Sequence, residues 1–397
     1  MKFYSSLIPN PQSLTPNPLS LYVHIPYCLV KCPYCDFNVY AVKQWPEEQY
    51  VEALCAEFRH YVAQPPWQNQ PIETLYFGGG TPSLFAPSAI ARFLKYVTDY
   101  SAIAPQAEIT LEADPASVSY EKLAGYRAIG VNRLSFGVQS FHPTVLKTLG
   151  RLHTIDDVQH SLAWVREAGF RNVSLDLIFA VPGQTLDMFA FDVSQAIAYG
   201  PTHLSTYCLT YEERTPFFSL RKKGRLVPVS EDEEIEMYTQ VRAQCKTAGY
   251  EHYEISSFAQ PQFRSRHNTN YWNGTNYLGL GAGAHSYANT PDWGIRWSNE
   301  RNPRRYMEKV ITCGEARSVE DTLTRDQAMG EFMFLNLRQR DGFLPAAFAA
   351  RFGTDVYAAF SQIPTLIADG LLIEEVGRVK LSERGLLLAD SIFAEFF

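Results

Sequence analysis

The sequence predicts an α/β fold: a partial barrel of six strand–helix units, followed by a smaller winged-helix-like domain. Six short segments rich in β-branched and aromatic residues recur between residues 19 and 320, and segments with apolar residues at helical spacing separate them. Such alternation predicts parallel strands joined by right-handed crossovers. Six units favour a partial barrel over a complete eight-unit one. From about residue 321 the pattern changes to helices and one hairpin.

The barrel elements follow one another regularly. The first predicted helix has Val51 and Leu54 at helical spacing, and the second begins with Pro87, which suits a first helical turn. The third and fourth are followed by Gly130 and Gly169, as helix ends often are. The predicted strands are residues 21–25, 74–78, 108–112, 133–138, 173–179 and 203–209, and the predicted helices are residues 47–62, 87–97, 119–129 and 156–168.

Residues 321–397 predict a second, smaller domain, whereas residues 1–18 form an N-terminal extension. The smaller domain has helices at residues 327–337, 346–351 and 356–369, a hairpin at 370–381 and a last helix that begins near Gly385. This is a winged-helix-like pattern, and many winged helices bind DNA. However, the segment holds 7 Lys and Arg against 11 Asp and Glu, whereas a module that reads DNA carries a basic face. We therefore expect a structural or partner-docking role.

The overall composition predicts a cytoplasmic protein that does not bind nucleic acid. The net charge is −7, which argues against a general nucleic-acid binder. Four cysteines, Cys55, Cys208, Cys245 and Cys313, are scattered singly and form no disulfide framework. No apolar run approaches the roughly 20 residues that span a bilayer. Peripheral association with a membrane and homodimerisation are left open.

Three cysteines lie close together directly after the first predicted strand, in Cys28-Leu-Val-Lys-Cys32-Pro-Tyr-Cys35. Structural zinc sites take four protein ligands, so three thiolates suit zinc poorly. They suit a [4Fe–4S] cluster in which three irons are bound by Cys and the fourth iron is open to another ligand. The alternative is a set of unrelated buried cysteines, which the clustering of three within eight residues disfavours.

This three-then-two spacing resembles the signature of the radical S-adenosylmethionine (SAM) superfamily, in which SAM occupies the open iron. Active sites of barrel folds gather where the parallel strands end, and polar or glycine-rich residues follow four of the predicted strands here. Glycines let a backbone approach a ligand closely, although such a run is also an ordinary turn. The resemblance implies a SAM site made of Tyr22, Gly78, Gly79, Gly80, Thr81, Glu112, Gln139, Arg151 and Asp176.

A narrower resemblance covers the chain from about residue 19 to the end. The string from Tyr22 to Cys28, the 79–82 turn, the 137–140 segment and the C-terminal domain are similar to the oxygen-independent coproporphyrinogen dehydrogenase (HemN) lineage. Members that act on coproporphyrinogen have a fourth cysteine two residues after the third, where this chain has Phe37. In lacking this cysteine, the chain resembles instead the sister family of heme chaperones, HemW.

A second motif points to the same family. The string His267-Asn268-Thr269-Asn270-Tyr271-Trp272 resembles the His-Asn-x-x-Tyr-Trp motif of the HemW family. The resemblance implies a heme-binding segment near residues 264–286, with His267 as iron ligand and Tyr271 and Trp272 against the macrocycle. Arg264 and Arg266 would pair with the propionates. The alternative is a structured loop in which His267 bonds the backbone and Trp272 fills the core.

These observations predict a heme chaperone that binds heme and transfers it to acceptor proteins, on a scaffold that holds a [4Fe–4S] cluster and SAM. Whether it turns SAM over is left open. One alternative is an oxygen-independent coproporphyrinogen III dehydrogenase, which performs oxidative decarboxylation. Another is a redox-sensing winged-helix regulator with an iron–sulfur cluster.

Three weaker features complete the sequence. Residues 279–283 are glycine-rich, but no clear strand precedes them and no helix pattern follows, so they are expected to pack against the barrel mouth. His24 is either a neighbour of the cluster loop or a satisfied core histidine. Residues 231–234 are acidic and are expected to form the first turn of a helix.

Overall fold

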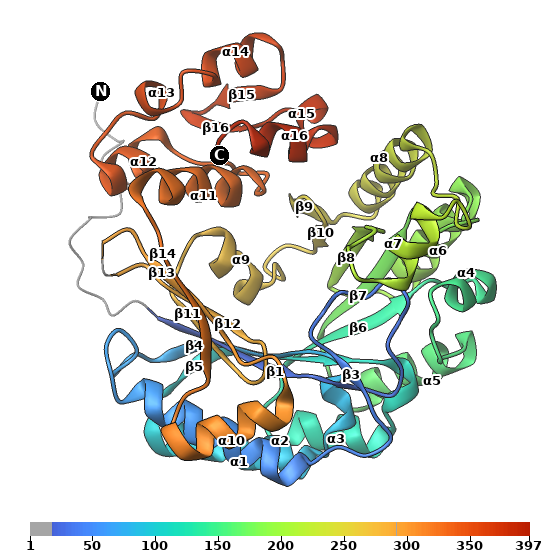
Figure 1. Cartoon of the computed structure of the whole chain (residues 1–397). Coiled ribbons are helices and arrows are strands. Elements are labelled where there is room, and N and C mark those ends of the chain that lie inside the picture. Colours follow the sequence, from blue (N-terminus) through green and yellow to red (C-terminus); the bar gives the residue numbers. More distant parts are fainter. Residues whose placement is uncertain (1–17, 291) are drawn as a thin grey trace, which may run out of the picture.

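The computed structural model describes residues 18–290 and 292–397, and its core is one sheet of 12 strands. The six predicted barrel strands are confirmed: they lie side by side in chain order and pair in parallel (Figure 1). The predicted N-terminal extension lies outside the described residues, except for Pro18. The six strands are β1 (Leu19–Ile25), β4 (Ile72–Gly79), β5 (Ile103–Ala113), β6 (Arg133–Gln139), β7 (Asn172–Phe179) and β8 (His203–Cys208).

Helices follow these strands along the chain, and α1, α2 and α3 lie below the sheet in Figure 1. Their start signals are local. Thr154 and Asp157 form a reciprocal capping box at the start of α5, and Ser230 and Glu233 form another at the acidic first turn of α8, as expected. The helices are α1 (Glu47–Val62), α2 (Pro87–Tyr100), α3 (Tyr120–Ala128), α4 (Pro143–Thr148), α5 (Ile155–Glu167), α6 (Leu186–Ala198), α7 (Pro216–Lys222) and α8 (Glu231–Thr247).

The sheet continues past both edges of the predicted barrel. On one side, β11 pairs in parallel with β1, and β12, β13 and β14 follow in antiparallel order; on the other side, β10 and β9 extend β8. The expectation that no clear strand precedes residues 279–283 is wrong, because β11 begins at Tyr277 and includes Gly279. A Cβ there would lie 2.0 Å from the carbonyl oxygen of His285. The added strands are β9 (Glu251–Glu254), β10 (Ser257–Ala259), β11 (Tyr277–Leu280), β12 (His285–Ala288), β13 (Ile295–Asn299) and β14 (Arg317–Thr322).

The C-terminal residues from Leu323, directly after β14, form a second hydrophobic core that also includes Tyr287 of β12. The predicted hairpin is present, but the predicted helix at 356–369 is two helices. Phe360 leaves the helical region, and the second helix starts with Ile363 and Pro364. The elements are α11 (Arg325–Leu337), α12 (Pro345–Phe352), α13 (Val356–Ala359), α14 (Ile363–Ala368), β15 (Leu372–Glu375), β16 (Arg378–Leu381), α15 (Glu383–Leu387) and α16 (Ala389–Ala394).

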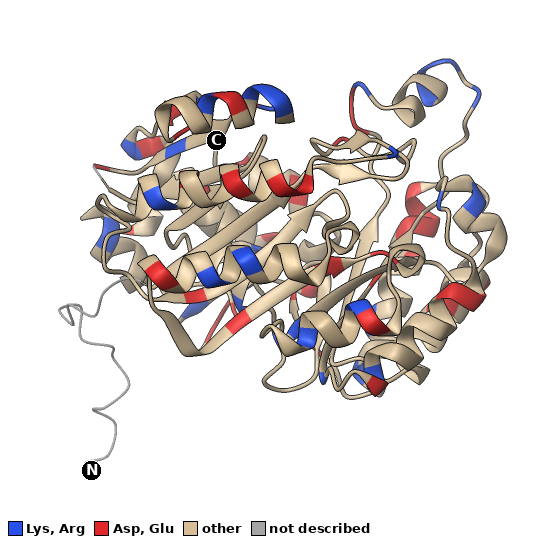
Figure 2. Ribbon diagram, turned by 90° about the horizontal axis from the view of Figure 1, so that it is seen from below, with Lys and Arg blue, Asp and Glu red and all other residues tan. Residues whose placement is uncertain are grey.

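Two segments connect the sheet with its surroundings. The helix α9 (Arg266–Trp272) lies between the sheet and the C-terminal domain, and α10 (Pro303–Cys313) lies beside α1 (Figure 1). Basic and acidic positions are interspersed over the helices seen from below (Figure 2). Within the described residues, no helix has both the length and the apolar character needed to cross a membrane.

Candidate cofactor site

The three clustered cysteines lie on the loop that leaves the C-terminal end of β1. Two short parallel strands, β2 (Tyr27–Cys28) and β3 (Tyr40–Ala41), close the base of this loop. The N–H of Val42 donates to the carbonyl oxygen of Cys28 over 3.0 Å, which ties the end of the loop to its start. All three thiols are free and partly exposed. The loop therefore presents its thiols at the mouth of the barrel, as the sequence predicts.

The surroundings of these thiols fit an iron–sulfur cluster. Thr81 Oγ1 lies 3.5 Å from the Sγ of Cys28, and Arg151 Nη1 lies 3.8 Å from the Sγ of Cys32. Burial raises the pKa of the Cys28 thiol to about 11 and also raises that of Cys35. Among the described residues, no three Cys, His, Asp or Glu side chains could share one metal ion. In a four-iron cube each thiolate binds a different iron, and the three cysteines of this loop stay the predicted ligands.

The glycine turn after β4 lies against the start of the cysteine loop. The N–H of Gly80 donates to the carbonyl oxygen of Ile25 over 2.8 Å, and the N–H of Thr81 donates to that of Tyr27 over 2.9 Å. A Cβ on Gly80 would lie 2.6 Å from the carbonyl oxygen of Tyr27 and 3.0 Å from the Sγ of Cys28. Any larger residue would displace the loop, so glycine is a steric requirement here.

Behind the turn, His24 is a buried histidine whose two ring nitrogens are both hydrogen-bonded, which is one of the two roles expected for it. Its Nε2 lies 2.9 Å from the carbonyl oxygen of Asn38, and its Nδ1 lies 3.0 Å from the hydroxyl of Tyr22. A carbonyl can only accept, so Nε2 carries the proton and Nδ1 accepts from Tyr22. Burial lowers the pKa of His24 to about 4, so the ring is neutral. It supports the turn by packing under Gly79, whose φ is +113°.

Glu112 lies at the end of β5 and faces the glycine turn. Its carboxylate accepts from the hydroxyl of Tyr76 over 2.9 Å and from the N–H of Gly79 over 3.1 Å. Burial raises its pKa to about 7, although the Tyr76 hydrogen bond opposes the shift. A Cβ on Gly78 would come within 2.9 Å of the Tyr22 ring, so Gly78 allows close packing beneath this carboxylate. Glu112 can thus hold or release a proton near neutral pH.

The remaining predicted SAM residues lie on the neighbouring strands and loops. Asp176 accepts from the hydroxyl of Ser135 over 2.9 Å, and burial raises its pKa. Gln139 ends β6 with a φ of +67°, which turns the chain out of the sheet. Arg151 forms an ion pair with Asp114 and donates to the carbonyl oxygen of Gly137 over 3.1 Å.

One cavity of about 800 Å³ brings most of the predicted cluster and SAM residues together. Its lining includes Cys28, Cys32, Cys35, Gly79, Gly80, Thr81, Glu112, Gln139, Arg151 and Asp176, whereas Tyr22 and Gly78 lie outside it.

The sequence pattern did not predict three further parts of the lining of this cavity. Asp114 pairs with Arg151, and its position just after β5 was a usable signal. Arg133 is fully buried at the opposite end of its strand, where nothing in the pattern distinguishes it. The C-terminal domain contributes residues 386–391 to the lining. No local motif predicts that contact, because it depends on how the second domain packs on the sheet.

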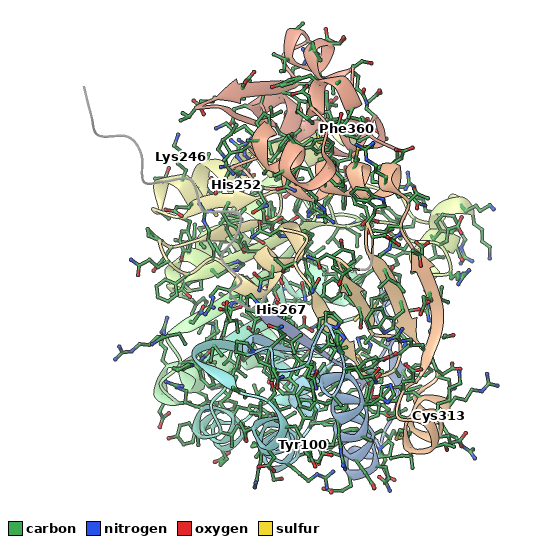
Figure 3. The ribbon with its side chains drawn as sticks, turned by 90° about the vertical axis from the view of Figure 1, so that its left-hand side faces the viewer. Tyr100, Lys246, His252, His267, Cys313 and Phe360 are labelled. Atoms are coloured by element: carbon green, nitrogen blue, oxygen red, sulfur yellow. The ribbon has the colours of Figure 1, made fainter. Side chains whose placement is uncertain are left out.

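The histidine of the predicted heme segment is buried. His267 lies near the start of α9 and is 1% exposed; Figure 3 labels it between the sheet and the C-terminal domain. Its Nδ1 lies 2.8 Å from Thr74 Oγ1, and its Nε2 lies 2.8 Å from the hydroxyl of Tyr271. Burial lowers its pKa to about 3. Both ring nitrogens are engaged, so its role as iron ligand stays a prediction that requires breaking one of these bonds.

The other predicted heme residues divide into two groups. Tyr271 and Trp272 line a second cavity. Arg264 pairs with Asp341 over 2.7 Å and Arg266 pairs with Glu73 over 3.2 Å, so both cations already have carboxylate partners. The contact of Tyr271 and Trp272 with heme therefore stays a prediction, while the two candidate propionate partners are engaged elsewhere.

Comparisons with known proteins agree with this geometry. Residues 22–194 match the Radical SAM superfamily model, and residues 323–388 match the HemN C-terminal domain model. The chain is 36% identical over 371 residues to the heme chaperone HemW of Bacillus subtilis, covering 91% of this chain and 94% of that protein. It is 36% identical over 366 residues to HemW of Escherichia coli, covering 91% and 93%. The solved coproporphyrinogen III oxidase (HemN) of Escherichia coli superposes with a TM-score of 0.82 at 26% identity, covering 96% of this chain and 90% of that one.

Proposed function

Because the chain belongs to the HemW family of heme chaperones, within the radical SAM superfamily, we propose that it binds heme and transfers it to acceptor proteins. The observation that carries this proposal is the match to heme chaperones over almost the whole length of both chains. Phe37 supports it, because a phenyl ring has no sulfur or other heteroatom to take the place of the fourth cysteine that characterises the coproporphyrinogen-converting members of the lineage.

The cysteine loop and the strand ends would hold the two cofactors of the superfamily. Cys28, Cys32 and Cys35 are the three thiolate ligands for a [4Fe–4S] cluster, and Arg151 offsets negative charge beside Cys32. When bound, such a cluster supplies the electron that cleaves SAM in enzymes of this superfamily. The polar groups around the cavity, above all Glu112 and the turn at residues 79–81, would bind and orient SAM.

Heme binding calls for apolar walls with a few cationic groups, because the macrocycle is flat and apolar and its propionates are anionic. Tyr271 and Trp272 supply aromatic surface beside the cofactor cavity. The guanidinium of Arg338 lies 4.5 Å from the Trp272 ring centroid, which holds the indole in place. The cargo would therefore be held next to the cofactor cavity and would not replace SAM within it.

A second candidate function is the oxygen-independent oxidative decarboxylation of coproporphyrinogen III. The close likeness to a coproporphyrinogen III oxidase favours it, whereas Phe37 argues against it. The acidic C-terminal domain argues against the hypothesis of a DNA-binding regulator, because a module that reads DNA carries a basic face.

An absorbance titration with heme on anaerobically reconstituted protein tests the proposal. We expect a stoichiometric Soret band, and transfer of that heme to an added apo-hemoprotein. A Cys28→Ser variant should lose its cluster absorbance, which checks the ligand assignment separately. Protein that binds no heme but converts coproporphyrinogen III in the presence of SAM and a reductant would replace the chaperone with the enzyme.

A further inference from the structure

A second cavity of about 1110 Å³ lies beside the cofactor cavity. The sheet strands β12, β13 and β14 form one wall, and α9 and α11 form the facing wall. Four residues line both cavities: Asp36, Phe37, Gly79 and Glu112. The volume lies just above the roughly 300–1,000 Å³ of small-molecule pockets. A large, flat ligand could thus lie next to SAM without sharing its space.

The strand register places one aromatic and polar surface in this cavity. Tyr277 pairs with Tyr287, and Tyr287 pairs with Arg296, so these three side chains lie on the same face of the sheet. His285 lies two residues before Tyr287 and therefore shares that face. All four line the cavity. The Tyr271 ring continues the surface from α9, with its centroid 4.6 Å from that of Tyr277.

His285 is the histidine of this cavity that is free to bind a metal. Its side chain is exposed, and within the described residues its imidazole makes no hydrogen bond. In contrast, His24 and His267 have both ring nitrogens engaged. Partial desolvation by the cavity walls lowers the pKa of His285, and the Arg301 and Arg296 guanidiniums lower it further. The neutral imidazole, which is the form that ligates iron, therefore predominates at pH 7.

Arg301 is the cation of this cavity that is free to bind an anion. Its Nε lies 3.4 Å from Asn38 Oδ1, and in the part of the chain that the structure describes it pairs with no carboxylate. Arg296 also lines the cavity, but it pairs with Asp321 over 2.7 Å and with Glu331. Of these two arginines, only Arg301 therefore offers a ligand carboxylate a guanidinium that has no carboxylate partner.

We propose that heme occupies this second cavity, with His285 as an iron ligand and Arg301 as the partner of a propionate. The proposal rests on the proposed function and deepens it by assigning the cargo site. Phe37, which lines both cavities, then separates the heme from the cluster and SAM. Its aromatic ring offers apolar surface to the macrocycle at the position where the decarboxylating relatives have a cysteine.

Heme titrations on the full-length, cluster-reconstituted protein test the iron ligand. We expect His285→Ala to lose the Soret spectrum of the wild type and to bind heme at least tenfold more weakly, with its cluster absorbance unchanged. His160→Ala is the matched control, because His160 is an exposed histidine on α5 outside both cavities. A wild-type spectrum in His285→Ala, together with its loss in His267→Gln, would overturn the site but leave heme binding intact. Absence of heme binding in the wild type would instead contradict the proposed function.

Heme dimethyl ester, which lacks free propionates, tests the second contact. We expect Arg301→Ala to keep the wild-type Soret spectrum and to bind heme about tenfold more weakly, because one charge-assisted contact is lost. The same variant should bind the dimethyl ester as tightly as the wild type does. An equal loss for heme and for the ester would show that Arg301 supports the fold of the cavity and does not contact a propionate.

Discussion

Single residues at the cofactor cavity are constrained by their contacts and by their charge state. Gly80 has no Cβ because the space beside it is filled by the Tyr27 carbonyl and the Cys28 thiol. Glu112 keeps a buried carboxylate whose two acceptor contacts, from Tyr76 and Gly79, come from β4. Both residues tie β4 or the turn after it to a neighbouring segment.

At the residue scale, Glu112 predicts a pH-dependent affinity for SAM. Burial raises its pKa to about 7, so the carboxylate that would attract the cationic amino group of SAM is mostly protonated at pH 6 and mostly ionised at pH 8. We expect SAM to bind about tenfold more tightly at pH 8 than at pH 6. Isothermal titration calorimetry on reconstituted protein measures this ratio.

The matched variant is Glu112→Gln, which keeps the shape of the side chain but cannot ionise. Its affinity for SAM should be low at both pH values and should not change between them. If the wild-type ratio persists in this variant, another group is responsible for the pH dependence.

At the scale of elements, one buried side chain joins the extension of the sheet to the barrel. Glu57 on α1 accepts from the N–H of Gly281 over 2.9 Å, from Asn299 Nδ2 over 2.7 Å and from the hydroxyl of Tyr306 over 2.6 Å. These partners lie after β11, on β13 and on α10. A single carboxylate therefore holds together three elements that the barrel pattern does not include.

The raised pKa of Glu57 predicts how the free energy of unfolding depends on pH. Burial raises its pKa from 4.5 to about 7, so the folded state binds this proton more tightly than the unfolded chain does. Its contribution to the free energy of unfolding should therefore be largest at low pH and should fall as the pH rises from about 4.5 through about 7. Urea denaturation of wild type and Glu57→Gln across this range measures the difference.

The variant should show a flatter pH profile than the wild type in that window. Glu57→Ala should be destabilised at every pH, by about 2–5 kcal/mol, because it leaves three donors without a partner and creates a cavity. Parallel profiles for wild type and Glu57→Gln would refute the assignment to this carboxylate.

For the whole molecule, the C-terminal domain closes the cofactor cavity. It contributes residues 386–391 to the lining, and Tyr287 of β12 is part of its hydrophobic core. Arg338, directly after α11, pairs with Glu254 of β9 over 3.4 Å and stacks on Trp272 of α9. The second domain thus contacts the edge strand β9 and the inner strand β12, while the structural or partner-docking role expected from its acidic composition stays a prediction.

The packing of the two domains predicts the effect of Arg338→Ala. Removing the guanidinium leaves the buried Glu254 carboxylate without its ion partner and frees the Trp272 ring, so we expect a loss of about 2–4 kcal/mol of stability. Hydrogen exchange should rise in α9 and α11 and remain unchanged in α2 and α3. Arg304→Ala is the matched control, because the Arg304–Glu308 pair is exposed on α10. Uniformly faster exchange in Arg338→Ala would indicate global destabilisation instead.

The sequence by itself determined the features that depend on short spacing. The cysteine loop, the glycine turn, the six parallel strands and the capping residues are encoded within a few positions of one another, where composition and period are informative. Family resemblance added the cofactors and the heme-chaperone function. The ends of neighbouring parallel strands must meet at one edge, which is why most predicted SAM residues line a single cavity.

Only the tertiary structure decided which distant residues meet. His267 has the local pattern of a ligand, yet its partner Thr74 lies on β4, and the resulting hydrogen bond engages the ring. The pairing of β11 with β1 creates the second cavity and places His285 and Arg301 beside it. A local pattern reports which face of an element is apolar, but it does not report which element will cover that face. That choice is made by packing between segments far apart in the chain.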